Sequence, residues 1–439
     1  MRGTQNINQN GHLTIGGADT VQLAEKYGTP LYVYDLESIK ATILRFKSAF
    51  KPFEVNWQVA YASKAFSTVA MIQVIGEMGL SLDVVSGGEL FTALKAGFPA
   101  SRIHFHGNNK SESEISMAIE AKIGAFVVDN FYELMLIEEE AIKHGSKVNI
   151  LLRLTPGVEA HTHAYVTTGQ EDSKFGFTLS NGDAEKAIEL TQNLPHLHLL
   201  GIHSHIGSQI FDADGFVLAT KRILERLPLW KEQLRFSPEV FNVGGGFGIK
   251  YTEEDDPIPF ENQIQRIVTT IVDYCEAKAL QVPEIWIEPG RAIVGEAGTT
   301  LYTIGSTKTI PGVRKYVAVD GGMSDNIRPS LYGAKYEALL ANRAEDDVEE
   351  TVSIAGKCCE TGDMLIWDIE LPTPKAHDLL AVFCTGAYGY SMANNYNRLA
   401  RPAVVFVEKG TDYLVVERES FDDLTKNDIP LPAPVLSAE

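Results

Sequence analysis

The chain has 439 residues, 44% of them hydrophobic, which suffices for a large buried core and favours two domains. Its net charge of −20 argues against nucleic acid as a partner, and the lack of a long apolar run argues against a signal peptide or a membrane span. Its four cysteines have neither disulfide-framework nor metal-ligand spacing, so we expect a reducing cytoplasm and no metal.

Eight short apolar runs alternate with longer stretches between residues 57 and 288. Such runs are typical of parallel strands buried between helices. Eight of them in roughly 250 residues predict an α/β fold, a (β/α)8 barrel of the TIM type. An open doubly wound sheet is the alternative, but it gives no reason for the count of eight. The predicted strands are Val59–Ala62, Leu80–Val85, Ile103–His106, Ala125–Asp129, Val148–Leu154, Leu199–His205, Val240–Val243 and Ile285–Glu288.

Beyond about residue 301 the chain shows short strands, turn signals and little helical periodicity, which predicts a C-terminal all-β domain, either a β-barrel or a sandwich. We assign residues 36–300 to the barrel, residues 1–35 and 301–425 to the β domain, and residues 426–439 to a frayed tail. The run Leu31–Tyr34 precedes the barrel, and we expect it to pair with the β domain. The predicted β-domain strands are Tyr316–Val319, Thr351–Ala355, Leu379–Phe383, Ala403–Val407 and Tyr413–Val416.

Two charged residues end predicted barrel strands. Lys64 follows the first strand, where a fixed amine can form a Schiff base with an aldehyde. Glu288 ends the eighth strand and is followed by Pro289-Gly290-Arg291, whose glycine permits close approach of a ligand. A lysine for an aldehyde and a carboxylate for a ring nitrogen are what pyridoxal 5'-phosphate (PLP) needs from a protein.

Further polar groups follow other strands at the same predicted face, where barrels of this kind build their active sites. The triplet Gly244–Gly246 comes after the seventh strand, a position that favours phosphate binding on backbone N–H groups over a simple flexible turn. Strand alternation places His203 and His205 on one side, so either of them could stack on a flat ring. Ser208 could donate a hydrogen bond to a phosphate.

These motifs together resemble those of the barrel-type (fold type III) PLP-dependent decarboxylases, over essentially the whole chain from about residue 31 to residue 407. The motifs of the barrel are Tyr61–Ala65, Ser86–Glu89, His106–Lys110, His203–Gln209, Gly244–Gly246 and Glu288–Arg291. Others narrow the resemblance to the diaminopimelate decarboxylases, namely Thr162–Gly169, Asp172–Gly176, Asp320–Met323, Arg328–Tyr332, Cys359–Asp363 and Gly386–Tyr388.

The resemblance implies a set of cofactor contacts. Lys64 would carry PLP, Glu288 would keep the ring nitrogen protonated, and His205 would stack on the ring. The other cofactor contacts that the resemblance implies are Ser208, Gly245, Gly246, Gly290, Arg291 and Tyr388. Asp320 and Asp363 we interpret as structural turn residues.

The resemblance also implies the reaction, which is decarboxylation of meso-2,6-diaminopimelate to L-lysine and CO2, the last step of lysine biosynthesis. The enzyme would be a carboxy-lyase. Cys359 would protonate the carbon that CO2 leaves. The family builds its active site across a subunit interface, so a homodimer with shared sites is expected, with substrate and dimer contacts from the β domain. The substrate-binding residues would be Arg291, Arg328, Tyr332, Glu360 and Tyr388.

Three other functions compete with this interpretation. A decarboxylase of ornithine, arginine or lysine has a substrate without a second carboxylate, which suits Arg291, Arg328 and Tyr332 poorly. A non-catalytic PLP-binding homologue would be expected to lack Lys64 or Cys359, and both are present. A racemase would need a tyrosine base opposite the lysine, and no motif locates one.

Overall fold

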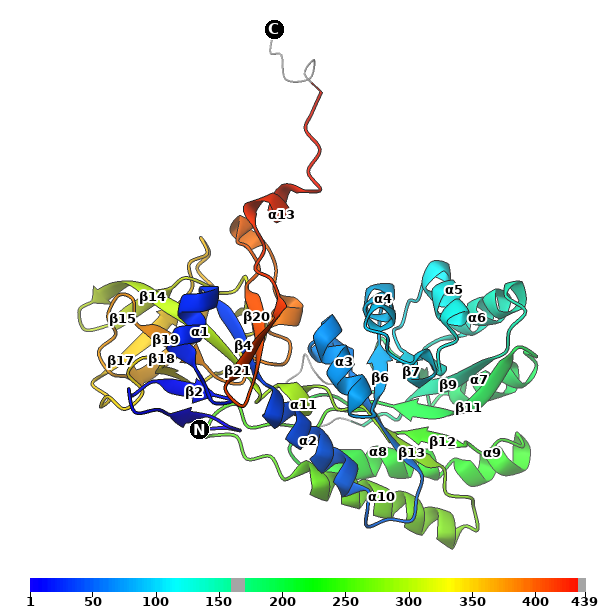
Figure 1. The fold of residues 1–439 in the computed structure, drawn as a ribbon. Helices are drawn as coiled ribbons and strands as arrows, with labels where there is room; N and C mark the ends of the chain where they lie inside the picture. The colour runs from blue at the N-terminus through cyan, green and yellow to red at the C-terminus, as the bar shows by residue number, and fades with distance from the viewer. Residues whose placement is uncertain (159–169, 433–439) are drawn as a thin grey trace.

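The molecule consists of a barrel domain and a β-sheet domain that lie side by side (Figure 1). The computed structural model describes residues 1–158 and 170–432. The motif Thr162–Gly169 and the tail residues 433–439 lie outside the described residues. Within the described ranges, every helix is too short or too polar to traverse a lipid bilayer.

Eight parallel strands close into a barrel, as the apolar runs predicted. β5 pairs with β6 and β13, and the pairing continues around the ring until β8 meets β9. Most strand residues are buried because helices cover the outside while side chains fill the inside. The strands are β5 (Trp57–Ala62), β6 (Ser81–Val84), β7 (Ile103–Phe105), β8 (Ala125–Val128), β9 (Val148–Thr155), β11 (Leu197–Ser204), β12 (Val240–Asn242) and β13 (Glu284–Ile287), with the short β10 (Phe177–Thr178) beside β9.

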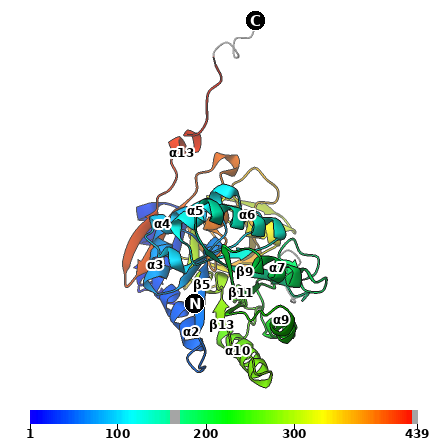
Figure 2. The same ribbon diagram turned by 90° about the vertical axis from the view of Figure 1, so that its right-hand side faces the viewer.

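Helices surround the barrel (Figure 2), and polar caps mark where several of them begin. At α5, Ser111 and Glu114 form a reciprocal capping box that satisfies N–H groups of the first turn. The helix before the barrel, α2, packs on α10 through the stacked rings of Phe46 and Phe260, whose centroids are 3.9 Å apart. The helices are α2 (Leu36–Ala49), α3 (Val69–Glu77), α4 (Gly87–Lys95), α5 (Glu112–Ala121), α6 (Phe131–Lys143), α7 (Asp183–Gln192), α8 (Asp214–Leu224), α9 (Leu227–Gln233), α10 (Phe260–Ala277) and α11 (Arg291–Val294).

The β domain is built around one long strand, β14. Its residues 298–301 pair with β4, residues 300–303 with β19, and residues 304–310 with β15. β4 also pairs with β20, so the run Leu31–Tyr34 belongs to this sheet, as the sequence indicated. The strands are β4 (Leu31–Asp35), β14 (Gly298–Ile310), β15 (Arg314–Val319), β16 (Ala338–Leu340), β17 (Glu350–Ala355), β18 (Met364–Leu371), β19 (Leu379–Val382), β20 (Ala403–Glu408) and β21 (Thr411–Val416).

The segment before β4 forms a small antiparallel sheet and one helix on the β domain. It comprises β1 (Asn6–Ile7), β2 (Leu13–Ile15), β3 (Ala18–Asp19) and α1 (Thr20–Tyr27). The N–H of Leu13 donates to the carbonyl of Ala341 at 2.8 Å, which ties this N-terminal arm to the domain. Near the other end of the chain, α13 (Phe421–Thr425) leads into residues 426–432, which extend away from the body (Figure 1).

Candidate active site

All nine residues predicted to bind the cofactor line one cavity at the C-terminal ends of the barrel strands. The cavity has a volume of about 380 Å³. It lies where the barrel meets the β domain, because its walls come from loops after β5, β11, β12 and β13 and from the loop after β19. The nine residues are Lys64, His205, Ser208, Gly245, Gly246, Glu288, Gly290, Arg291 and Tyr388.

Lys64 lies in the short turn that ends β5. It is exposed to the cavity, whereas Ser63 and Ala65 on either side are buried. The turn is fixed on both sides, since Ser63 Oγ donates to Glu89 Oε2 at 2.8 Å and the N–H of Tyr388 donates to the carbonyl of Ala65 at 2.8 Å. A firmly held backbone therefore presents the amine to the cavity, as covalent catalysis by lysine requires.

Glu288 is a buried carboxylate oriented by three side chains. Asn242 donates its amide to Oε1 at 2.6 Å, and the Nε2 atoms of His106 and His203 lie 2.9 and 3.1 Å from the two carboxylate oxygens. Burial on its own raises the pKa of Glu288, but His106 and His203 outweigh it, so the pKa lies well below its usual value. The cavity therefore contains an ionised carboxylate that a cationic ring nitrogen can meet.

His205 lines the same cavity. Burial, with the positive charges of Lys64 and Arg153, lowers the pKa of His205 well below its usual value. Its Nδ1 accepts from the N–H of Gly245 at 3.3 Å. His203 lies on the same side, as the strand alternation predicted, but its ring binds the carboxylate described above. The neutral ring of His205 is the one suited to stack on a flat ligand.

The glycine triplet Gly244–Gly246 packs backbone against backbone with the loop after β11. A Cβ on Gly246, whose φ is +115°, would lie 2.3 Å from the carbonyl oxygen of Gly207, so only glycine fits. Beside it, Ser208 Oγ accepts from Nε and Nη2 of Arg291 at 3.3 and 2.9 Å. Close-packed backbone, a hydroxyl and a guanidinium are groups that bind a phosphate.

A second cavity, of about 350 Å³, is lined by Arg328 and Tyr332 and shares Arg291 with the first. Both guanidinium carbons lie between 4.9 and 5.8 Å from the ring centroids of Tyr251 and Tyr388. Both arginines are buried, and among the described residues neither is paired with a carboxylate. Two buried cations without an anion are unfavourable, which indicates a binding site for a carboxylate ligand.

Cys359 and Glu360 lie outside both cavities. They belong to the turn between β17 and β18, and both are exposed. The N–H of Cys359 donates to Asn397 Oδ1 at 2.7 Å, and Glu360 Oε1 accepts from the N–H of Gly362 at 3.3 Å. Within one chain, therefore, the structure does not bring these two residues to the cavity that Lys64 lines.

Three further charged or titratable residues line the first cavity without a role assigned from the sequence. Burial raises the pKa of Asp83 to about 6, although the nearby His106 opposes this. Arg153 is half-buried beside Asp129, with Nε 3.8 Å from Oδ1. The sequence feature that could have identified Asp83 and His106 as cavity residues is their position at strand ends. For Arg153 it is a charge within the otherwise apolar strand β9.

Two aspartates interpreted as structural do bind backbone. Asp363 accepts from the N–H groups of Met323 and Cys358 at 2.6 and 2.7 Å. Asp320 accepts from the N–H of Thr303 at 2.9 Å. These contacts shape the turns that precede α12 (Arg328–Tyr332) and Cys359.

Comparison with known proteins places this architecture in a family. A family model described as pyridoxal-dependent decarboxylase, pyridoxal binding domain, matches residues 36–295. The diaminopimelate decarboxylase of Bacillus subtilis (strain 168) is 62% identical over 430 residues, with 98% of each chain covered. The crystal structure of diaminopimelate decarboxylase from M. jannaschii in complex with L-lysine has a TM-score of 0.92 and 38% identity, with 99% of each chain covered. The crystal structure of diaminopimelate decarboxylase from Helicobacter pylori in complex with L-lysine has a TM-score of 0.85 and 31% identity, with 93% of this chain and 98% of that chain covered.

The fold and the site define a pyridoxal-dependent decarboxylase of the barrel type. Within that class, the chain belongs to the diaminopimelate decarboxylase family.

Proposed function

We propose that this chain uses PLP to decarboxylate meso-2,6-diaminopimelate, giving L-lysine and CO2. The observation that carries the proposal is the pair of adjoining cavities. One contains an amine opposite an ionised carboxylate, and the other contains two buried guanidiniums with no carboxylate partner among the described residues. L-lysine bound in the related structures from M. jannaschii and Helicobacter pylori agrees with this product.

PLP fits the first cavity by the chemistry of its donor set. Lys64 would bind the aldehyde carbon, the ionised Glu288 would meet the ring nitrogen, and His205 would stack on the ring. When bound, PLP supplies the electron sink for the electron pair that departing CO2 leaves. The phosphate would be held by Ser208, Gly245, Gly246, Gly290, Arg291 and Tyr388.

The residues of the second cavity select the substrate. Arg291, Arg328 and Tyr332 bind the distal carboxylate, because planar guanidiniums recognise a carboxylate with paired hydrogen bonds. A distal carboxylate held there fixes the reacting carbon over the first cavity. Glu360 binds the distal ammonium group, and Cys359 delivers a proton to the carbon that has lost CO2.

Cys359 and Glu360 reach the site from a second copy of the chain in a homodimer, since neither lines the two cavities described above. The β domain then provides both substrate and dimer contacts. The four cysteines are free, which agrees with a location in a reducing cytoplasm.

The main alternative is decarboxylation of ornithine, arginine or lysine. Solved lysine/ornithine decarboxylases at 21% identity share the fold with this chain, so fold alone does not separate the two activities. Substrates of that kind have no distal carboxylate and would leave Arg328 buried without an anion, which is costly. The second cavity therefore favours the dicarboxylate substrate.

A direct test measures CO2 release and lysine formation from the meso, LL and DD isomers of diaminopimelate, with and without added PLP. Ornithine, arginine and lysine serve as competing substrates in the same assay. We expect PLP-dependent turnover of the meso isomer and little turnover of the three monocarboxylates. Preferred turnover of a monocarboxylate would contradict the proposal.

Replacing Glu288 by Gln is expected to leave PLP bound but to lower kcat by roughly a hundredfold. The amide keeps the shape of the side chain, yet it has no charge with which to keep the ring nitrogen protonated. Cofactor content by absorbance and turnover by CO2 release measure the two effects separately. Near-wild-type turnover at full cofactor content would show that the carboxylate does not have this role.

Replacing Arg328 by Ala is expected to raise KM for meso-diaminopimelate by about tenfold or more and to lower kcat, because the distal carboxylate no longer positions the reacting carbon. The cofactor spectrum should not change. Arg314→Ala, which removes an arginine of β15 paired with Asp368, is the matched control. If Arg328→Ala and Arg314→Ala behave alike, other residues must bind the distal carboxylate.

A further inference from the structure

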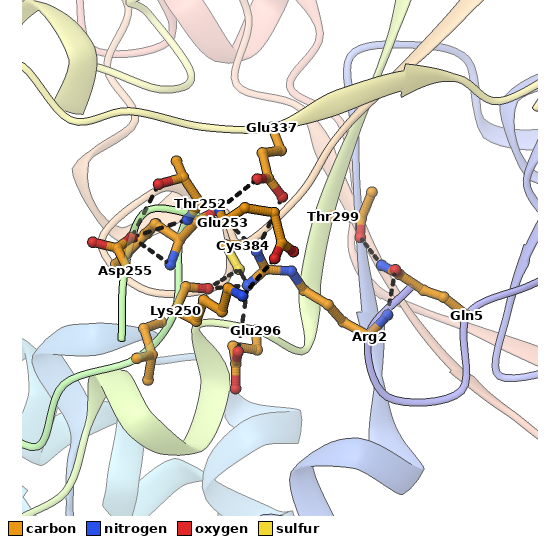
Figure 3. Close-up of polar contacts among 12 residues, drawn as sticks. Arg2, Gln5, Lys250, Thr252, Glu253, Asp255, Glu296, Thr299, Glu337 and Cys384 are labelled. Atoms are coloured by element: carbon orange, nitrogen blue, oxygen red, sulfur yellow. Dashed lines mark hydrogen bonds and ion pairs between the residues drawn. The ribbon is translucent and has the colours of Figure 1, made fainter. Parts of the chain in front are cut away.

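The side chain of Arg2 reaches from the N-terminal arm to the loop after β12 (Figure 3). Its Nη1 donates to the carbonyl of Lys250, and its Nη2 donates to the carbonyl of Tyr251 at 2.9 Å. The side chain is only 14% exposed. Among the described residues, the only other donor to either carbonyl is the thiol of Cys384, which lies 3.4 Å from the carbonyl oxygen of Lys250.

The same guanidinium contacts three side chains from other parts of the fold. Nη1 lies 3.3 Å from Glu296 Oε1 and 2.7 Å from Cys384 Sγ, and Nη2 lies 3.3 Å from Glu337 Oε2. Glu296 follows the turn that ends α11, whereas Cys384 and Glu337 belong to the β domain (Figure 3). Arg2 therefore joins the arm, the barrel and the β domain at one point.

The loop that Arg2 fixes carries a residue of the second cavity. The hydroxyl of Tyr251 lies 2.5 Å from Nη1 of Arg291, and the guanidinium of Arg328 lies over the same ring at 5.8 Å. Asp255 fixes the loop from the other side by accepting the N–H groups of Tyr251 and Thr252 at 3.0 and 2.9 Å. The backbone of Tyr251 is thus fixed through its N–H by Asp255 and through its carbonyl by Arg2.

The contact of Arg2 with Glu296 lies close to the helix that carries Arg291. Arg291 is the first residue of α11, and its carbonyl accepts from the N–H of Gly295, directly before Glu296. Nη1 of Arg2 contacts the loop that carries Tyr251. The same nitrogen also contacts the carboxylate of Glu296, which follows the helix that carries Arg291, the partner of the Tyr251 hydroxyl. Loss of Arg2 would release the loop carbonyls to water and leave Glu296 and Glu337 without this cation.

We propose that Arg2 is a positioning residue for substrate binding. By fixing the carbonyls of Lys250 and Tyr251, it presents the phenol of Tyr251 to Arg291 and so orients the guanidinium that meets the distal carboxylate. This inference rests on the proposed function, since it assigns Arg2 to the recognition of that carboxylate. A purely structural Arg2, which only fastens the arm, would affect stability without a selective effect on KM.

A double-mutant cycle between Arg2→Ala and Tyr251→Phe separates these two roles. Each single variant is expected to raise KM for meso-diaminopimelate by about tenfold and to lower kcat, as in Arg328→Ala, because a displaced Arg291 no longer positions the reacting carbon. The double variant should raise KM no further than either single variant, because both changes remove the same support of Arg291.

Gln5→Ala is the matched control on the same arm, since Gln5 bonds to Thr299 and to the backbone of Arg2 but not to the loop (Figure 3). It should leave KM unchanged. Arg2→Lys keeps the charge yet cannot donate to both carbonyls in a fixed fork, so it should restore KM only in part. It also provides a folded variant should Arg2→Ala fail to fold.

The outcomes are distinct. Independent, multiplying effects of Arg2→Ala and Tyr251→Phe on KM would overturn the inference, as would a wild-type KM in both Arg2→Ala and Arg2→Lys. In either case an active wild-type enzyme leaves the proposed function intact. A wild-type protein that does not turn over meso-diaminopimelate would overturn the proposed function, and this inference with it.

Discussion

The Lys64→Ala protein is expected to show none of the visible absorbance of covalently bound PLP and to lose at least about a thousandfold in turnover. The reason is that Lys64 is the amine presented to the first cavity by a rigid, buried turn. Absorbance spectra of wild type and variant, recorded after saturation with PLP, measure the first effect. CO2 release measures the second.

Lys64→Arg is the matched variant for charge. It keeps a cation in the cavity but has no amine that can react with the aldehyde, so it should fail like Lys64→Ala if the role is covalent. A substantial fraction of wild-type turnover in Lys64→Arg would show that the charge alone suffices.

Borohydride reduction followed by peptide mapping identifies the reacting amine directly. A second lysine near the strand ends is Lys110, which follows β7 but is buried. Its ammonium donates to the carbonyls of Gly107 and Val127, both at 2.9 Å, and it pairs with Glu133. We therefore expect the label on Lys64 and none on Lys110. A label on any other lysine would disprove the assignment.

The barrel could be predicted from sequence because each of its strands is buried on both faces and therefore reads as an apolar run. The long strand β14 could not. Its first residues are buried between β4 and β19, whereas its later residues are exposed beside β15. The strand as a whole therefore shows no single pattern of apolar and polar residues. Similarly, β18 starts with buried residues and continues through the half-exposed Trp367. Both strands lie in the domain where packing varies along a single strand.

Most barrel residues that line the first cavity could be predicted from the sequence, since position at the end of a barrel strand already places them at one face, whereas Tyr388 of the β domain was expected only from the family resemblance. Their mutual contacts could not. Glu288 directly follows β13, while His106, His203 and Asn242 come from three other strands or their ends. Only the closed ring brings these three side chains within 3.1 Å of the Glu288 carboxylate. The partnership of Arg2 with Tyr251 across the domains was equally invisible, because nothing in residues 1–5 forms a recognisable motif.

Mixing two inactive variants, Lys64→Ala and Cys359→Ala, is expected to restore about a quarter of wild-type activity. In the proposed homodimer, two-fold symmetry creates two equivalent sites at one interface, each with Lys64 from one chain and Cys359 from the other. Each homodimer lacks one of these groups in both sites. A heterodimer has one site with both defects and one site with neither. If subunits exchange freely, about half of the dimers are mixed, and half of their sites are intact.

The exposed position of Cys359 is what motivates this prediction. Its turn between β17 and β18 lies outside the cavity that Lys64 lines, so a proton donor from the same chain would have to travel to the reacting carbon. Native mass spectrometry establishes the fraction of heterodimers, and CO2 release from meso-diaminopimelate measures the recovered activity.

A mixture of Lys64→Ala with Glu288→Gln provides the matched control, because both residues line the barrel cavity of one chain. In that heterodimer each site has one of the two defects, so activity should stay near the average of the two homodimers. Recovery in the first mixture but not in the second assigns Lys64 and Glu288 to one chain of each site and Cys359 to the other. Confirmed heterodimers of Lys64→Ala and Cys359→Ala without recovery would place the whole site within one chain.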